Sequence, residues 1–186
     1  MQRAESMTGQ ATLSYPHLVD RLAINVARPY SDFCRQYEDA VPPLDPAHLA
    51  ALVKRHTPWA EVLADARASA PRNFFIFWKM DAAPMMKLAG HDSSCTTYLM
   101  GNYTIAERMF RYDPAVMLYA PLRTAIYVDA ENQTRFLIDR PSSLFSSFAN
   151  QDIADVGVEL DAHVAALLVA LGVPAPGELR RSWEEA

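Results

Sequence analysis

The segment GHDSSC, residues 90–95, is the densest group of reactive side chains in the sequence. It places an imidazole, a carboxylate, two hydroxyls and a thiol between two apolar stretches, so His91 could act as a general acid or base beside Asp92. Neighbouring residues of an extended segment point to opposite sides, which argues against a ready-made His91–Asp92 dyad. The alternative is a polar surface turn. Cys95 could be a nucleophile, and the alternative is that it is a small apolar side chain buried in the core.

The histidines and cysteines do not have the spacing of a metal site. His48 and His56 are separated by a predicted helix break and lack the i, i+3 or i, i+4 spacing of helical metal ligands. The two cysteines, Cys34 and Cys95, are expected to be free thiols. A His or Met could ligate a haem, but the alternative interpretation is that the methionines form an adaptable hydrophobic core. Because motifs for nucleotides and for serine hydrolysis are also missing from the sequence, we predict no metal and no cofactor.

Aromatic and methionine side chains are concentrated between residues 74 and 127. This composition is typical of a pocket for an apolar or aromatic ligand, and equally of a core or a dimer interface. If a pocket forms, we expect Asn102 to fix the polar end of the ligand. The side chains expected to surround the ligand are Trp78, Tyr98, Met100, Tyr103 and Tyr119.

Two functions of different class are compatible with these residues. The first is a non-enzymatic module that binds a small apolar or aromatic molecule. The second is a cofactor-independent isomerase, lyase or cyclase for an apolar substrate, with His91 as acid or base and Asn102 polarising an oxygen. We expect the binding module, because it needs fewer precise geometric coincidences, and the question of catalysis stays open.

The stretch CTTYLMGNYTIAERMF, residues 95–110, must position Asn102 and Tyr103. A strand over 95–100 is expected to stop at Gly101, which permits a positive φ or the close approach of another backbone. Asn102 can hydrogen-bond within its own turn and expose the N-terminus of the next helix to an acceptor; a simple tight turn is the alternative. Thr104 and Glu107 have the spacing of a capping box at that helix start.

The first half of the chain contains two strand patterns and three helix patterns. A strand is expected within 17–27 and a helix over 30–41. Asp45-Pro46 and Thr57-Pro58 each combine an N-cap residue with a proline at the first helical position, which predicts two helices within 42–71. Residues 73–80 are apolar on both faces, and this pattern predicts the central strand of a sheet.

The second half reads as a short helix ending at Gly90, the strand and helix of residues 95–110, and a hairpin with strands over 124–128 and 134–138. A short helix over 142–148 and a long apolar helix over 151–171, capped by Asn150, complete the pattern. These elements predict an α+β fold, in which helices 30–41 and 151–171 back a mostly antiparallel sheet.

Four motifs in this order, DAAPMMKLAG, YLMGNYTIAERMF, YAPLRTAIYVD and FLIDRPSSLFSSF, resemble a bacterial family called domain of unknown function 302. The matching positions are Ala89-Gly90, Gly101-Asn102 and Pro121-Leu122, and the resemblance covers about residues 74–171, with a looser match over 17–41. It implies a small α+β domain that forms a homodimer. Tyr103 replaces the family's usual proline, and residues 42–71 look like a helical insertion. The family has no settled activity, so the resemblance implies a fold and not a mechanism.

Length and charge narrow the class of protein. The 186 residues, 51% of them hydrophobic, predict one compact domain over 17–173, with a flexible lead-in at 1–16 and a polar tail at 174–186. The formal charge of -5 argues against nucleic-acid binding, because such proteins present a basic face. The apolar stretches are much shorter than the ~20 residues of a membrane helix. The N-terminal residues lack the apolar core of a signal peptide, so a cytoplasmic location is expected.

Overall fold

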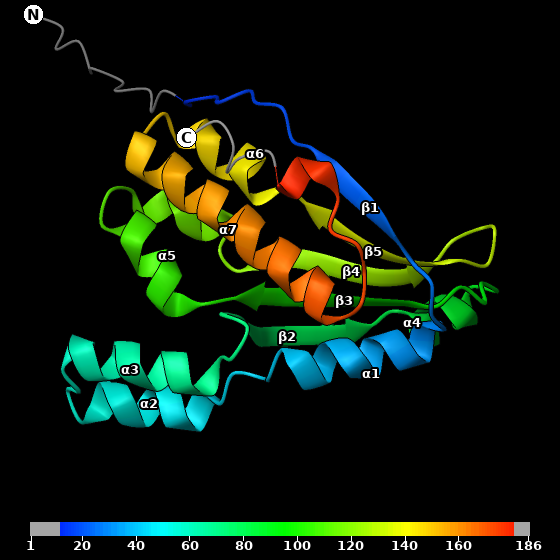
Figure 1. Cartoon of the computed structure of the whole chain (residues 1–186), viewed down its shortest axis with the longest axis horizontal. Helices are drawn as coiled ribbons and strands as arrows, with labels where there is room; N and C mark the ends of the chain where they lie inside the picture. The colour runs from blue at the N-terminus through cyan, green and yellow to red at the C-terminus, as the bar shows by residue number, and fades with distance from the viewer. Residues whose placement is uncertain (1–11, 181–186) are drawn as a thin grey trace, which may run out of the picture.

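A five-stranded antiparallel sheet in the order β1-β5-β4-β3-β2 is the framework of the computed structural model, which describes residues 12–180 (Figure 1). Its strands are β1 (Arg21–Val26), β2 (Phe75–Asp81), β3 (Cys95–Gly101), β4 (Leu122–Val128) and β5 (Thr134–Asp139). Parts of the predicted lead-in (1–11) and tail (181–186) lie outside the described residues.

Seven α-helices accompany this sheet within the described residues, which confirms the predicted α+β fold. They are α1 (Tyr30–Ala40), α2 (Pro46–Lys54), α3 (Trp59–Ser69), α4 (Ala83–Leu88), α5 (Tyr103–Phe110), α6 (Pro141–Phe145) and α7 (Gln151–Ala170). Short 3-10 turns are η1 (Pro114–Leu118), η2 (Ser146–Phe148) and η3 (Gly177–Leu179). As expected, Asn150 caps α7, because its side chain accepts a hydrogen bond from the backbone N–H of Ile153 at 3.2 Å.

One face of the sheet carries the hydrophobic core. Alternate residues of the paired strands are buried in register: Ile126 faces Phe136, and Phe136 faces Ile24 across the next pair. Helix α1 packs on this face through Phe33 and Tyr37, whose rings lie 6.4 Å and 5.8 Å from that of Phe136. Helix α7 contributes nine buried residues, which include Val164, Leu167 and Leu168 in the same core. The two helices predicted to back the sheet therefore both do so.

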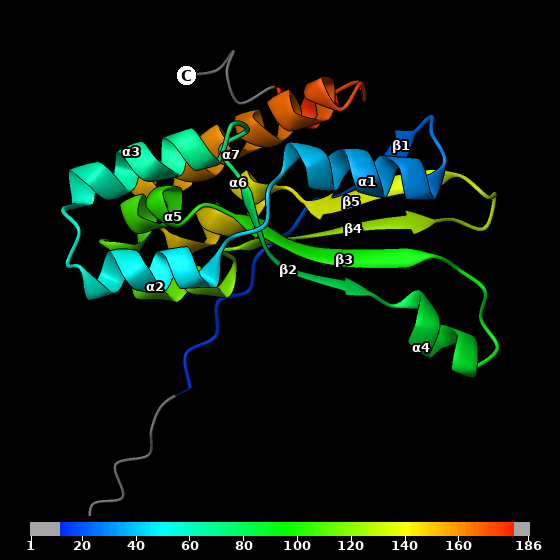
Figure 2. The same ribbon diagram turned by 90° about the horizontal axis from the view of Figure 1, so that it is seen from below.

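The opposite face, here called the open face, has no helix against it in Figures 1 and 2. Its side chains are the residues that alternate with the core positions. Trp78 and Met80 are each 46% exposed there, and Leu99, Ala125 and Leu137 are half-buried.

The prediction that residues 73–80 form the central strand is wrong, because β2 lies at the edge of the sheet. Its apolar pattern has two other causes. Phe75 packs beneath α3 with Ala66 and Ala70, and Trp78 faces outward. The outer edge of β2 is also protected, since the backbone N–H of Ile76 donates to Pro42 and that of Leu44 donates to Ile76, both at 2.9 Å.

Helices α2 and α3 form an antiparallel hairpin beyond one end of the sheet, beside α5, whereas α4 lies at the other end (Figures 1 and 2). Asp45 caps α2 as predicted, because its carboxylate accepts from the backbone N–H groups of Ala47 and His48. Thr57 does not cap α3: Pro58 is the N-cap residue and makes no side-chain cap. The backbone pairing of residues 42–44 with β2 holds the hairpin against the sheet.

The start of α5 corrects the predicted capping box. Asn102 is the N-cap residue, and its side-chain oxygen accepts from both the backbone N–H (2.9 Å) and the hydroxyl (2.8 Å) of Thr104. Glu107 instead forms an ion pair with Arg111 at 2.6 Å. Because Asn102, two residues before Thr104, already provides the acceptor, the Thr104 hydroxyl becomes a donor.

Gly101 serves the close approach that was one of its two predicted roles, since its φ is not positive. A Cβ atom at this position would lie 2.9 Å from Cβ and 3.1 Å from Cα of Pro121. We therefore expect Gly101→Ala to lower the free energy of unfolding by about 1–3 kcal/mol, the usual cost of overpacking. Denaturant titration checks this value. Gly177→Ala, which meets no atom within 4 Å, is the control and should change stability little; equal losses in both variants would contradict the steric explanation.

Candidate functional site

A cleft of about 320 Å³ lies between the α2–α3 hairpin, β2 and α5, and it is called the hairpin cleft below. Its apolar wall includes Leu44, Leu49 and Phe75. The hairpin alone would be a pair of surface helices; its attachment to β2 through residues 42–44 creates the concave surface. The cleft is large enough for a ligand of about one aromatic ring with a short substituent.

His48 and Asp65 form a polar pair in the cleft and link the two helices of the hairpin. Nε2 of His48 lies 3.0 Å from Oδ1 and 2.9 Å from Oδ2 of Asp65. The side chains are 45% and 28% exposed, so both remain in reach of a ligand. A carboxylate held against one imidazole nitrogen orients the ring and leaves the other nitrogen for a further partner.

Tyr103, a predicted ligand-binding residue, lines the same cleft. Its ring stacks on that of Phe75 with a centroid distance of 5.9 Å and an interplanar angle of 13°. Burial, with a smaller contribution from the negative charge of Asp65, raises the pKa of the Tyr103 phenol. The phenol therefore stays a neutral hydroxyl that can donate or accept a hydrogen bond.

Asn102 lies next to Tyr103, yet both ends of its amide already have partners. Its oxygen accepts the bonds that cap α5, and its Nδ2 donates to the backbone oxygen of Asn73 at 3.1 Å. The predicted role of holding the polar end of a ligand would therefore have to use the second hydrogen of Nδ2.

Tyr98 and Met100, also predicted to line the pocket, are fully buried in the core under α1. The Tyr98 hydroxyl donates to Glu38 at 2.8 Å, and the Tyr37 hydroxyl donates to the sulfur of Met100 at 3.0 Å. Burial and the nearby Cys34 and Glu38 raise the pKa of Tyr98. Both residues stabilise the packing of α1 on the sheet.

Trp78 and Tyr119 lie in two further places. Trp78 is on the open face, opposite Leu99. Tyr119 packs against Phe145 and Phe148 and borders a separate depression of about 420 Å³ near the end of the open face. The structure therefore does not gather the six predicted ligand-binding residues around one cavity; Tyr103 and Asn102 are the pair it keeps together.

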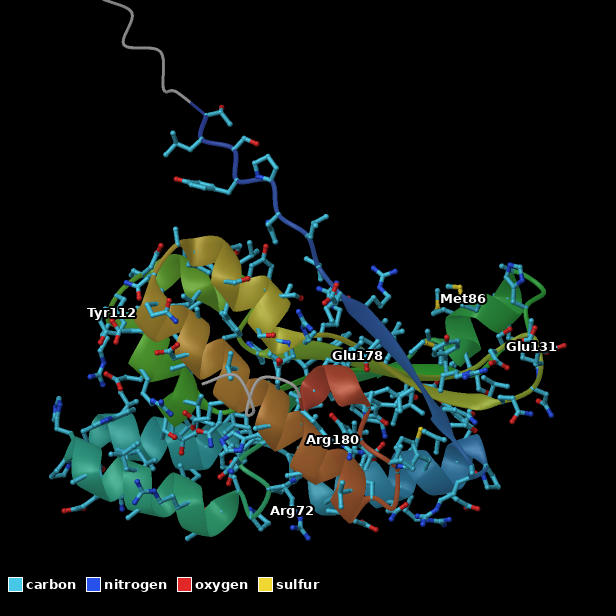
Figure 3. All side chains as sticks on the ribbon, turned by 45° about the horizontal axis from the view of Figure 1, so that its top comes forward. Arg72, Met86, Tyr112, Glu131, Glu178 and Arg180 are labelled. Carbon is cyan, nitrogen blue, oxygen red and sulfur yellow. The ribbon has the colours of Figure 1, made fainter. Side chains whose placement is uncertain are left out.

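His91 and Asp92 are exposed on the loop between α4 and β3. This loop is at the end of the sheet marked by Met86 and Glu131 in Figure 3, opposite to the end marked by Tyr112. Asp92 borders a shallow depression with Asp129 of the β4–β5 turn. Because β3 separates His91 from Asn102 by a strand length of roughly 20 Å, the two cannot act on one small substrate as the catalytic hypothesis requires.

Cys34 and Cys95 are free thiols, and burial raises the pKa of both. A raised pKa disfavours the thiolate, which is the nucleophilic form. Within residues 12–180, no three His, Cys, Asp or Glu side chains gather closely enough to hold a metal ion. No helix in that part of the chain is long and apolar enough to cross a membrane.

Sequence reasoning considered His48 only as a metal ligand and did not select Asp65. The sequence signal that could have paired them is the predicted helical hairpin. His48 and Asp65 lie at about the same number of residues from the turn between α2 and α3, and such positions face each other when two helices run antiparallel.

Comparison with known proteins identifies the fold family. The family model described as "Domain of unknown function DUF302" matches residues 45–171, a range that includes α2 and α3. A solved structure of an uncharacterized conserved DUF302 protein from Bacillus stearothermophilus has a TM-score of 0.57 at 12% identity. The alignment covers 80% of this chain and 94% of that chain, and at this identity the likeness concerns the fold alone. No curated protein matches the chain.

Proposed function

Because the chain belongs to the DUF302 family, whose description assigns no activity, we propose a function from its own geometry: the hairpin cleft binds a small molecule that carries an aromatic ring and one polar group. The observation that carries this proposal is the meeting of His48, Asp65 and Tyr103 in one cleft with apolar walls. A few polar side chains that converge in a concave site with apolar walls are the usual features of a ligand site.

The hairpin cleft is a better candidate than the larger depression beside Tyr119. Three residues that border that depression, Leu99, Arg123 and Asp139, belong to the open face. Asp139 already pairs with Arg21 at 3.4 Å. The lining of the hairpin cleft instead comes from residues 42–49, α3, Phe75 and Tyr103, and includes none of these three open-face residues.

Titration with benzyl alcohol, followed by the chemical shifts of backbone amides in and around the cleft, tests the proposal. We expect the shifts to centre on residues 42–49 and 65–75, and Tyr103→Ala to weaken binding about tenfold, since the variant loses the stacked ring and its hydroxyl. Tyr112→Ala makes the same chemical change at a 48% exposed tyrosine just beyond α5 and should leave the affinity within about twofold. Shifts that centre elsewhere, or equal effects of the two variants, would refute this assignment.

We also propose that two copies of the chain pair through the open face. Trp78 and Met80 are exposed on this face beside the half-buried Ala125 and Leu137, and isolated domains seldom leave such an apolar group uncovered. The charged Arg123 and Asp139 lie on the same face. Five strands of six or seven residues offer on the order of 500 Å² of flat area. With the flanking α4 and η1, this approaches the roughly 800 Å² per partner of a stable interface.

A further inference from the structure

We infer that the polar group of the ligand in the hairpin cleft is a protonated amine, so that the site selects small organic cations with an apolar body. This inference rests on the proposed binding function and specifies its chemical class. It follows from the charges of the lining side chains and from the aromatic pair beside them.

The charged side chains of the cleft are acidic. Asp45 and Asp65 both line it, and no Lys or Arg is among the described residues that do. Within the cleft, only His48 can offer a positive charge, and its Nε2 is already directed at Asp65. An anionic ligand would meet two carboxylates without a free cationic partner, whereas an ammonium group gains a charge-assisted hydrogen bond.

The Asp65 carboxylate can accept a hydrogen bond from a ligand while it keeps its contact with His48. It contacts the imidazole and lines the same cleft as Tyr103 and Phe75, and its charge contributes to the raised pKa of the Tyr103 phenol. A carboxylate accepts about four hydrogen bonds, and the imidazole occupies only part of this capacity.

The rings of Tyr103 and Phe75 supply the second element of cation recognition. They stack within the same cleft, and an aromatic face attracts a cation through its quadrupole. Carboxylate and aromatic ring together favour an ammonium group over a neutral hydroxyl, while the apolar wall at Leu44 and Leu49 accommodates the hydrocarbon part.

Three probes that share a benzyl skeleton test this inference: benzylamine, benzyl alcohol and phenylacetate. Titrated at neutral pH and low salt, benzylamine should bind about tenfold more tightly than benzyl alcohol, and phenylacetate most weakly. Asp65→Asn keeps the shape of the side chain without its charge, so it should weaken benzylamine far more than benzyl alcohol and thereby remove the preference for the amine. Glu131→Gln, an equal change of charge in the distant β4–β5 turn (Figure 3), should preserve the preference. Raising the salt concentration should weaken benzylamine alone, which provides a second readout without any substitution.

The outcomes separate the inference from the function on which it rests. If benzyl alcohol and benzylamine both bind in the cleft with equal affinity, or if phenylacetate binds most tightly, the cation preference is refuted and the binding function stands. If none of the three probes shifts the amides of the cleft, the binding function is refuted and the inference with it.

Discussion

Replacing Phe136 with alanine should lower the free energy of unfolding by about 3–5 kcal/mol. Phe136 is fully buried on β5 and receives the rings of Phe33 and Tyr37 from α1. The substitution leaves a cavity between sheet and helix that neighbouring side chains cannot fill without moving α1. Because native domains are stable by only about 5–15 kcal/mol, a large part of the stability would be lost. Urea denaturation followed by circular dichroism measures the change.

Phe110→Ala is the matched control for this prediction. It removes the same atoms from a phenylalanine that is 47% exposed at the end of α5, so we expect a loss below about 1 kcal/mol. Similar losses in both variants would show that Phe136 is not at the centre of the core.

Placing a charge at Ala125 should convert the proposed dimer to monomers. Ala125 lies on β4, the middle strand of the sheet, and its side chain is on the open face. It pairs with Thr97 of β3 on one side and with Leu137 of β5 on the other. In Ala125→Glu a carboxylate would be buried against the partner copy, and we expect the dissociation constant to rise at least about 100-fold. Sedimentation velocity across a dilution series measures this constant.

Ala130→Glu introduces the same charge in the exposed turn between β4 and β5 and should leave the association unchanged. Melting curves of both variants at a concentration where each is monomeric separate lost association from lost folding. A wild-type protein that sediments as a monomer at micromolar concentration would contradict the proposed pairing.

The sequence predicted most of the helices and strands because their signals are local. The cap at Asn150, the proline at the start of α2 and the alternation of β5 each depend on residues near in sequence. The position of β2 in the sheet was mispredicted for a physical reason. Apolar residues on both faces normally indicate a central strand, yet here a helical hairpin covers one part of the strand and the open face leaves another part exposed.

The candidate site was predictable only in part. Tyr103 follows Gly101, where β3 ends, and Asn102, which caps α5, so its position at the end of the sheet could be inferred from local pattern. His48 and Asp65 join it through the fold of the hairpin and its attachment to β2, which no local pattern specifies. Tyr98 and Trp78 were expected beside Tyr103, because Tyr98 is close to it in sequence and Trp78 lies on the neighbouring strand. The alternation of strand side chains instead directs Tyr98 to the core and Trp78 to the open face.

A crystal structure of the protein saturated with benzyl alcohol tests the central claim, that the hairpin cleft is the ligand site, most directly. The account predicts electron density for the probe between α2 and Tyr103, with its hydroxyl in hydrogen-bond distance of His48 or Asp65. Density for the probe beside Tyr119 or on the open face, with no density in an accessible hairpin cleft, would contradict it.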